Sequence, residues 1–261
     1  MNVIVCLKQV PGTTEVKIDS QTNTLIRQGI KNVINPFDTY ALEEGVRIKE
    51  RGEGKVTVIT MGPPQAEEAL REAISLGADE AILLSDRIFA GADTLATAYT
   101  LAEAVKKLGQ YDIIICGRQT IDGDTGQVGP ELAEILGIPF VAYISQIEEM
   151  ANGQMRVWRM VEEGHELIEA PLPAVITVVK EINVPRLPSL RGITKSKSAA
   201  IPVWGAQELG VDQGMVGLAG SATKVIKVFF PQGTCRAEIL QGELGSQVEC
   251  LVGKLKDAGL V

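Results

Sequence analysis

Residues 111–130 read Tyr111-Asp112-Ile113-Ile114-Ile115-Cys116-Gly117-Arg118-Gln119-Thr120-Ile121-Asp122-Gly123-Asp124-Thr125-Gly126-Gln127-Val128-Gly129-Pro130. The run from Ile113 to Cys116 is apolar, unbroken and rich in β-branched residues, which is typical of a strand buried on both faces of a parallel sheet. A glycine-rich segment follows it, and Glu131–Leu136 has the composition of a helix. The predicted order is therefore strand, glycine-rich loop, helix. In open α/β sheets, ligands bind outside the carboxyl ends of the strands, where such a loop lies.

Two interpretations of this loop stay open on spacing alone. Glycines let backbone N–H groups approach a phosphate, and the start of the next helix adds a favourable dipole. The same residues also suit a tight strand-to-helix turn with aspartates as caps, and neither G-x-G-x-x-G nor a Walker A pattern is present. Asp122 and Asp124 are possible ligands of a divalent metal, but no third and fourth oxygen ligand is visible nearby, so no metal site is predicted.

Composition limits the class of protein. The chain has 261 residues, of which 45% are hydrophobic and 4% aromatic, so a large core of aliphatic side chains is expected. A net charge of −8 argues against nucleic acid as the partner. The four cysteines are widely spaced, which predicts neither a disulfide framework nor a zinc site and fits a reducing cytoplasm. Neither a signal peptide nor a membrane span is predicted.

Strand-like and helix-like segments alternate through the first half of the chain. Helix signals begin at Asn35-Pro36-Phe37-Asp38, where Asn35 is a good N-cap and Pro36 suits the first helical position. This alternation predicts a parallel sheet with helices on both faces. Strands are predicted at 3–7, 56–61, 81–84, 113–116 and 139–144, helices at 36–51, 66–76, 94–108 and 131–136, and a surface hairpin at 16–18 and 24–26.

The pattern changes after about residue 145. Residues 156–161 and 165–169 alternate with period two around a Glu-Glu-Gly turn, which predicts an antiparallel hairpin at the sheet edge. Residues 174–179 return to a buried strand. His165, the only histidine, is expected on the surface, and no Ser-His-Asp or Cys-His arrangement is predicted around it.

Residues 183–205 are rich in proline and small polar residues and are predicted to be a loop. The segment is basic in an acidic protein, with Arg186, Arg191, Lys195 and Lys197. It is either a solvated linker or a docking loop, with Leu187, Leu190 and Ile193 as apolar anchors inside a basic rim. A strand is predicted at 225–230 and a terminal helix at 247–260. We expect a nucleotide-binding domain over 1–182 and an extension over 183–261 with too little core of its own.

Three segments together resemble one family. They are Cys6-Leu7-Lys8-Gln9-Val10-Pro11, Asn35-Pro36-Phe37-Asp38 and the run from Gly117 to Pro130. In this order and spacing they resemble the beta subunit of electron transfer flavoprotein over nearly the whole chain. The resemblance implies a Rossmann-like three-layer α/β sandwich with a mostly parallel sheet, an edge hairpin and an extended C-terminal arm.

The resemblance also implies a heterodimer with an alpha subunit that holds the main FAD, and an adenine nucleotide bound to the present chain. Leu190 resembles the leucine of the family's recognition loop, which anchors in a partner dehydrogenase, with Leu187, Arg191 and Ile193 beside it. The nucleotide site implied by the resemblance consists of Cys6, Asn35, Pro36, Phe37, Asp38, Met61, Gly117, Arg118, Gln119, Thr120, Ile121, Asp122, Gly123, Asp124, Thr125, Gly126, Gln127 and Val128.

The chemistry of these residues suggests a role for each. Cys6 and Met61 end strands beside the adenine or sugar, and Asn35 and Asp38 offer an amide and a carboxylate to the base or ribose. Gly123, Thr125, Gly126 and Gln127 bring donors to the phosphates. Arg118 suits the pyrophosphate or an anionic reduced isoalloxazine.

The family has two branches. In one, the beta subunit holds AMP as a structural ligand. In the other, it holds a second FAD that takes a hydride from NADH and bifurcates the electrons between ferredoxin or flavodoxin and, through the alpha-subunit FAD, an acyl-CoA dehydrogenase or related flavin dehydrogenase. The AMP branch usually has a bulkier, more acidic loop, whereas this loop has small residues, which favours FAD. An ATP-using enzyme such as an adenylyltransferase is a third possibility, but no signature lysine or histidine for pyrophosphate is visible.

Overall fold

A computed structural model describes residues 1–12, 17–18, 25–26, 32–226 and 237–261. It divides the chain into two units, Met1–Ile226 and Lys227–Val261. The predicted boundary at residue 182 differs from this division. Residues 183–226 belong to the first unit because they include a helix and a strand that pack on α2 and extend the sheet beside β7.

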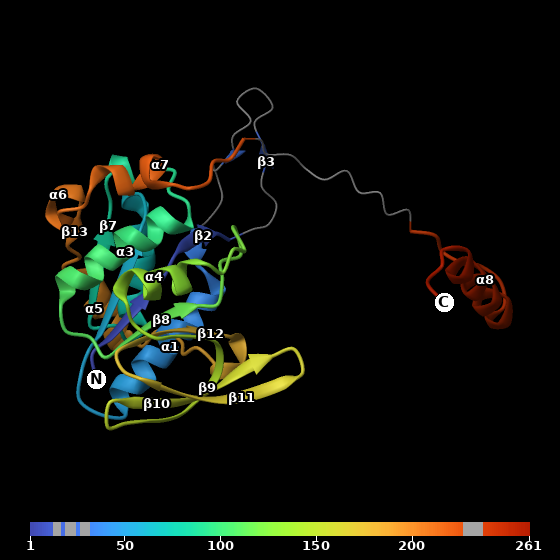
Figure 1. Ribbon diagram of the computed structural model, residues 1–261, viewed down its shortest axis with the longest axis horizontal. Coiled ribbons are helices and arrows are strands. Elements are labelled where there is room, and N and C mark those ends of the chain that lie inside the picture. The colour runs from blue at the N-terminus through green and yellow to red at the C-terminus, as the bar shows by residue number, and fades with distance from the viewer. Residues whose placement is uncertain (13–16, 19–24, 27–31, 227–236) are drawn as a thin grey trace. The chain divides into compact units, whose positions relative to one another are not determined.

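The first unit is built on a nine-stranded sheet (Figure 1). The strands from β13 to β9 in the sheet order are parallel, and β9, β10 and β11 are antiparallel, so the predicted α/β fold with an edge hairpin is confirmed. Across the sheet the order is β11 (Gly164–Pro171), β10 (Gln154–Val161), β9 (Phe140–Ala151), β12 (Ala174–Val178), β8 (Ile113–Gly117), β1 (Val3–Cys6), β6 (Val56–Met61), β7 (Glu80–Leu84) and β13 (Val203–Trp204).

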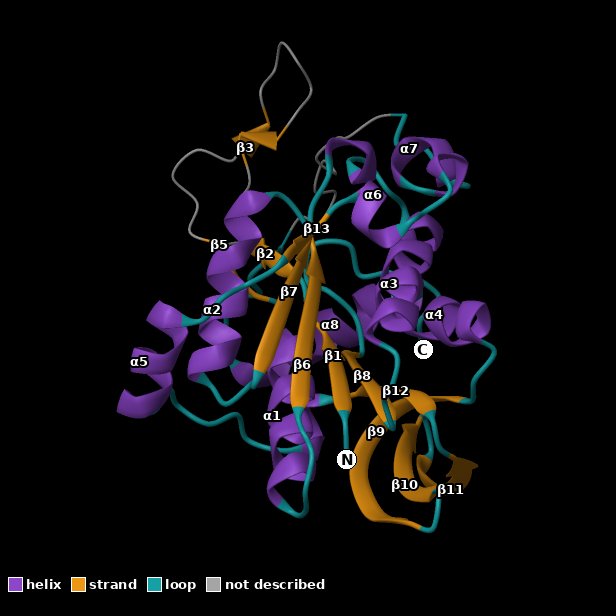
Figure 2. Ribbon diagram, turned by 90° about the vertical axis from the view of Figure 1, so that its left-hand side faces the viewer, coloured by secondary structure: helices purple, strands orange, loops and turns teal. Residues whose placement is uncertain are grey.

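Helices cover both faces of this sheet (Figure 2). On one face lie α1 (Pro36–Glu50) and α2 (Glu67–Ser75), with α5 (Leu190–Ser198) packed against α2. On the other face lie α3 (Thr94–Leu108) and α4 (Val128–Leu136). The remaining described elements are β2 (Gln9–Pro11), β3 (Lys17–Ile18), β4 (Leu25–Ile26), β5 (Asn32–Ile34), α6 (Ala206–Leu209), α7 (Gly217–Gly220), α8 (Leu244–Asp257) and the 3-10 helices Pro64–Ala66, Arg87–Phe89, Lys180–Ile182 and Gln213–Met215.

The central strand β1 shows why the sheet is buried on both faces. Val3 and Val5 join the core beneath α1 and α2, whereas Ile4 and Cys6 join the core beneath α3 and α4. Successive side chains of a strand point to opposite faces, so an unbroken apolar run fills two cores at once. β8 has the same pattern and pairs with β1 in parallel near the centre of the sheet.

Several predicted elements differ in extent. The strand predicted at 139–144 continues to Ala151, because its second half pairs antiparallel with β10. Antiparallel pairing of Lys17–Ile18 with Leu25–Ile26 confirms the described part of the first hairpin. Of the strand predicted at 225–230, residues 225 and 226 are not in a strand and the rest lie outside the described residues. The terminal helix begins at Leu244 rather than residue 247.

The loop predicted at 183–205 was wrong for its second half. Residues 190–198 form α5, and the Ser189 hydroxyl caps it by accepting a hydrogen bond from the Gly192 N–H at 3.0 Å. Glycine at 192 lets α5 approach the end of α2 closely, since a Cβ there would lie 3.0 Å from the Ser75 carbonyl carbon. Packing thus produces a helix from residues of low helix propensity.

Candidate functional site

Two strands and one helix meet at the carboxyl edge of the sheet. β1 ends at Cys6, β8 ends at Gly117, and α1 begins at Pro36 beside them. At Gly117 a Cβ would lie 2.7 Å from the Phe37 carbonyl carbon and 2.8 Å from the Asp38 nitrogen. Real Cβ atoms are not found so close to backbone, so glycine is required where the loop passes the start of α1.

Asn35 fixes the position of the loop. Its side chain is fully buried; the Nδ2 donates to the Gln119 carbonyl at 2.9 Å, and the Oδ1 accepts from the Ile121 N–H at 3.2 Å. Asn35 does precede α1, but its side chain makes no capping hydrogen bond, contrary to the N-cap role we predicted. Because both ends of its amide bind the loop backbone, Asn35 holds the loop against α1.

Asp38 joins the same three elements. Its Oδ2 accepts a hydrogen bond from the Lys8 backbone N–H at 2.7 Å, and its carboxylate lies beside Gly117. Burial raises the pKa of the Asp38 carboxyl from 3.8 to about 7, against the opposing effect of hydrogen bonds from Asn35, Lys8 and Gly117. The Asp38 side chain therefore accepts a hydrogen bond from the chain's own backbone, while its burial makes the ionised form unfavourable.

The acidic side chains of the loop have cationic or amide partners. Lys8 Nζ contacts the Asp122 carboxylate at 2.7 Å, and Gln119 Nε2 donates to Asp124 Oδ1. Burial raises the pKa of the Asp122 carboxyl, but the hydrogen bond and charge of Lys8 outweigh it and bring the pKa below its ordinary value. Lys8 was missing from the predicted site, although its place directly after the central strand is a signal visible in the sequence.

The middle of the loop presents backbone donors. Asp124 N–H donates to the Thr120 carbonyl at 2.9 Å. The N–H groups of Gly123, Thr125, Gly126 and Gln127 make no hydrogen bond to any part of the chain that the structure describes. They lie just before α4, so donors and a helix N-terminus occur together, which suits a phosphate. Within the described ranges, no three acidic, cysteine or histidine side chains are grouped to hold a metal ion.

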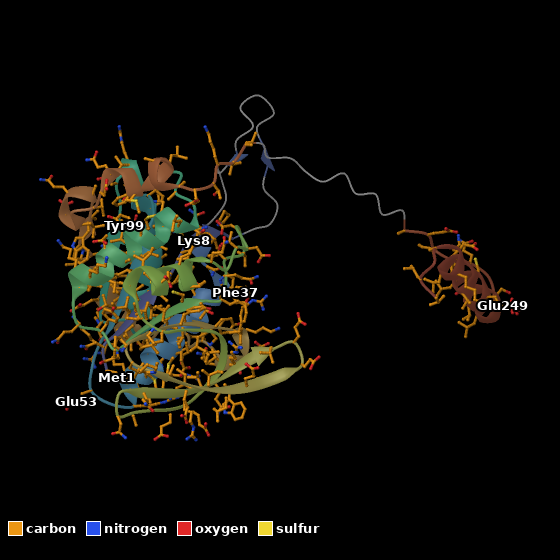
Figure 3. The ribbon with its side chains drawn as sticks, in the orientation of Figure 1. Met1, Lys8, Phe37, Glu53, Tyr99 and Glu249 are labelled. Carbon is orange, nitrogen blue, oxygen red and sulfur yellow. The ribbon has the colours of Figure 1, made fainter. Side chains whose placement is uncertain are left out.

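The other predicted nucleotide residues border this loop. Phe37 lies in the first turn of α1, and Lys8 and Phe37 are on the same side of the unit (Figure 3). Arg118 is exposed, and its guanidinium carbon lies 5.8 Å from the Phe37 ring centroid and 5.4 Å from that of Tyr143. Tyr143 was absent from the predicted site, because no local pattern connects it to residue 118.

Cys6 and Met61 are the last residues of β1 and β6, as the sequence predicts. Cys6 and Cys116 are register neighbours on β1 and β8, and both are buried free thiols. A hydrogen bond with Cys116 and burial raise the pKa of the Cys6 thiol, so it stays protonated. Met61 ends β6 and is partly buried. The two thiols are therefore buried members of the core rather than reactive groups.

The four predicted docking residues are grouped elsewhere in this unit. Leu187 and Leu190 are 88% and 86% exposed, Arg191 is exposed, and Ile193 is 37% exposed. Leu190, Arg191 and Ile193 belong to α5, so they stand on a capped helix rather than on the predicted loop.

Arg186 does not contribute to a free basic rim, contrary to our prediction. Its guanidinium contacts Glu43 at 2.8 Å and Glu50 at 2.6 Å, both on α1. The hydrogen bonds that Arg186 donates to Glu50 and Glu43 raise the pKa of its guanidinium further. Arg186 therefore fixes the segment before α5 to α1, next to the exposed Leu187 and Leu190.

No helix in the described part of the chain is long and apolar enough to cross a membrane.

Comparison with known proteins identifies the family. The electron transfer flavoprotein domain matches residues 22–209. The chain is 50% identical to an electron transfer flavoprotein subunit beta of Thermoanaerobacterium thermosaccharolyticum, over 100% of both chains. It is 47% identical to the same subunit of Clostridium acetobutylicum, over 98% of both. It is also 44% identical to the caffeyl-CoA reductase-Etf complex subunit CarD of Acetobacterium woodii, over 100% of both. The chain belongs to the electron transfer flavoprotein beta subunit family.

Proposed function

We propose that this chain binds an adenine nucleotide at the loop from Gly117 to Val128 and that the nucleotide is FAD. The observation that carries the proposal is a set of four N–H groups just before α4, those of Gly123, Thr125, Gly126 and Gln127, which make no hydrogen bond to the described residues. Lys8 and Gln119 neutralise or bind the two loop aspartates, which lowers their repulsion of a phosphate. Small side chains at 123, 125 and 126 leave space for a large ligand.

The flavin would supply the redox chemistry, since it exchanges hydride and single electrons. We propose that a heterodimer with an alpha subunit oxidises NADH and divides the electrons. One acceptor is ferredoxin or flavodoxin, and the other, reached through the alpha-subunit FAD, is an acyl-CoA dehydrogenase or related flavin dehydrogenase. The name of the Acetobacterium woodii relative, which joins a caffeyl-CoA reductase to an Etf complex, supports a partner that acts on an acyl-CoA.

A structural AMP is the second candidate ligand. The same donors would hold its single phosphate, and nothing in the N–H groups before α4 distinguishes one phosphate from two. In that case the chain is the docking and structural half of a non-bifurcating electron carrier.

The cofactor content of the heterodimer separates the two candidates. The co-expressed complex is denatured, and the released FAD and AMP are quantified per heterodimer. We expect two FAD and no AMP. One FAD and one AMP would reject FAD on this chain, and NADH-dependent reduction of ferredoxin should then be absent.

We also propose that α5 docks the dehydrogenase. Leu187 and Leu190 are almost fully exposed. The segment that carries them is nevertheless fixed to α1, because Arg186 forms ion pairs with Glu43 and Glu50. Exposed apolar side chains on a fixed support are typical anchors of a protein interface, because little order is lost on binding.

Replacing Leu190 by alanine should weaken electron transfer to the dehydrogenase by roughly tenfold, the effect of losing about 1.4 kcal/mol of binding energy at one anchor. The flavin content should not change, because α5 is separate from the loop at Gly117. Leu167→Ala on β11, which removes another exposed leucine, is the matched control and should be neutral. Equal coupling rates in wild type and Leu190→Ala would reject α5 as the docking surface.

The C-terminal helix is a further candidate contact with the alpha subunit. The described residues of its own unit bury no residue of α8, and the apolar residues of α8 recur at helical spacing at Leu244, Val248, Leu251 and Val252. An amphipathic helix needs a partner for such a face. We propose that residues 183–261 contribute docking and subunit contacts, with α8 on the alpha subunit.

A further inference from the structure

A β-bulge on β9 brings Tyr143 to the nucleotide loop. Along the parallel pair of β9 and β12, Val141 is opposite Ile176, whereas Ile144 is opposite Val178. Two residues of β9, Ala142 and Tyr143, therefore face the single residue Thr177. The Tyr143 N–H donates a hydrogen bond to the buried Thr177 hydroxyl at 3.1 Å. Bulges near functional sites commonly redirect a side chain.

The bulge has an energetic cost. Tyr143 has a φ of 57°, in the left-handed region that favours glycine. Its ring is 44% exposed, so burial of the ring in the core does not explain the conformation. Backbone strain of this kind persists only where the surrounding structure enforces it, and it is concentrated at functional sites.

The redirected ring lies beside Arg118. The guanidinium carbon of Arg118 is 5.4 Å from the Tyr143 ring centroid and 5.8 Å from the Phe37 ring centroid, within the range of cation–π contacts. The Arg118 N–H donates to the Val178 carbonyl at 3.0 Å, and its Nε donates to Gln119 Oε1 at 2.7 Å. The two terminal nitrogens make no hydrogen bond or ion pair with any described residue.

Arg118 and the loop form a cluster of donors. The loop returns towards Arg118, since a Cβ at Gly126 would lie 3.4 Å from the Arg118 carbonyl oxygen. The loop carboxylates are engaged by Lys8 and Gln119 rather than by Arg118. A guanidinium with free terminal donors next to open backbone N–H groups is suited to a phosphate, which accepts several hydrogen bonds at once.

We propose that Tyr143 is a positioning residue for Arg118. The bulge aims the tyrosine ring so that Arg118 is held between two aromatic faces, with its terminal nitrogens directed to a phosphate oxygen of the bound adenine nucleotide. This inference rests on the proposed nucleotide site, and it applies to AMP and FAD alike because both carry a phosphate.

The test compares Tyr143→Gly, Tyr143→Phe and Arg118→Ala in the intact heterodimer with alpha subunit. Dissociation constants for AMP and FAD at this site are measured by calorimetry after removal of bound nucleotide, and Tm is measured on the same samples. Tyr143→Gly should bind about tenfold more weakly, since a cation–π contact and the orientation of the guanidinium are lost. Tyr143→Phe keeps the ring and should stay within about twofold of wild type.

Stability should change in the opposite direction to binding. Glycine accepts a positive φ, so Tyr143→Gly should have the Tm of wild type or a higher one. A purely structural role for the ring would lower Tm and binding together. In an Arg118→Ala background, Tyr143→Gly should cause no further loss of affinity, because the group it positions is gone.

Three results would overturn the inference. The first is unchanged affinity in Tyr143→Gly, the second is a joint loss of Tm and affinity, and the third is an additive loss in the double variant. If wild-type heterodimer binds neither AMP nor FAD on this chain, the nucleotide site itself is wrong. That outcome is distinguishable, because it is seen before any variant is made.

Discussion

Gly117→Ala should destabilise the protein by about 3 kcal/mol, the upper end of the usual cost of forcing added atoms into close-packed structure. The new Cβ would lie 2.7 Å from the Phe37 carbonyl carbon and 2.8 Å from the Asp38 nitrogen. Both neighbours are backbone atoms in the first turn of α1, so no side-chain rotation relieves the contact. Movement of α1 would also strain the hydrogen bond that the Lys8 N–H donates to the Asp38 carboxylate.

Gly123→Ala is the matched control. A Cβ at Gly123 would meet only the Thr120 Oγ1, at an ordinary 3.5 Å, so stability should change by less than about 0.5 kcal/mol. Urea denaturation followed by tryptophan fluorescence measures both variants, since Trp158 and Trp204 belong to the first unit. Equal midpoints for the two variants would mean that the start of α1 can move freely, which would remove the argument that glycine is required there.

The fold was predictable because the strongest local patterns and the final packing agree. Ile113–Cys116 is apolar on both sides of the strand, and the structure buries it between two layers of helices. Alternating strands and helices lead to a parallel sheet, because each helix returns the chain to the start of the next strand and covers a face of the sheet. The period-two patterns of 156–161 and 165–169 likewise predicted an antiparallel hairpin at the sheet edge, which β10 and β11 form.

The contacts within the candidate site were not predictable from the sequence. Asparagine is favoured at the N-cap, yet the Asn35 amide forms hydrogen bonds with the backbone of Gln119 and Ile121, which are over 80 positions away. The helix α5 depends on the Ser189 cap and on close packing at Gly192, which outweigh a weak local propensity. Tyr143 reaches Arg118 only because Thr177 stabilises a bulge. Such contacts depend on tertiary structure, so one sequence does not reveal them.

The stability of the protein should fall as pH rises from about 4 to about 7, through the Asp38 carboxyl. Burial raises the pKa of this group to about 7 in the folded protein, against 3.8 for an ordinary aspartate. Below pH 4 both folded and unfolded chains hold the proton, so the full stability is present. Between these pH values the unfolded chain releases the proton while the folded chain keeps it, which favours unfolding.

The size of this effect follows from the shift in pKa. A shift of roughly three units corresponds to about 4 kcal/mol of unfolding free energy at pH 8, at 1.36 kcal/mol for each unit. Above pH 7 the Asp38 carboxyl is ionised in both the folded and the unfolded chain, so the loss of unfolding free energy no longer changes with pH. Asp38→Asn has no proton to release. The unfolding free energy of wild type minus that of Asp38→Asn should therefore decline between pH 4 and 7 and be flat on either side.

Asp86→Asn is a control with the opposite sign. Hydrogen bonds from the Ala206 and Ile88 N–H groups lower the pKa of the Asp86 carboxyl, so its contribution to stability is lost only as pH falls below about 4. The difference between wild type and Asp86→Asn should be flat from pH 5 to 8. A flat difference for Asp38→Asn over the same range would show that the Asp38 carboxylate is ionised at little cost. In that case the hydrogen bonds and charge that favour the ionised form would outweigh burial, and the candidate site would carry a negative charge at the start of α1.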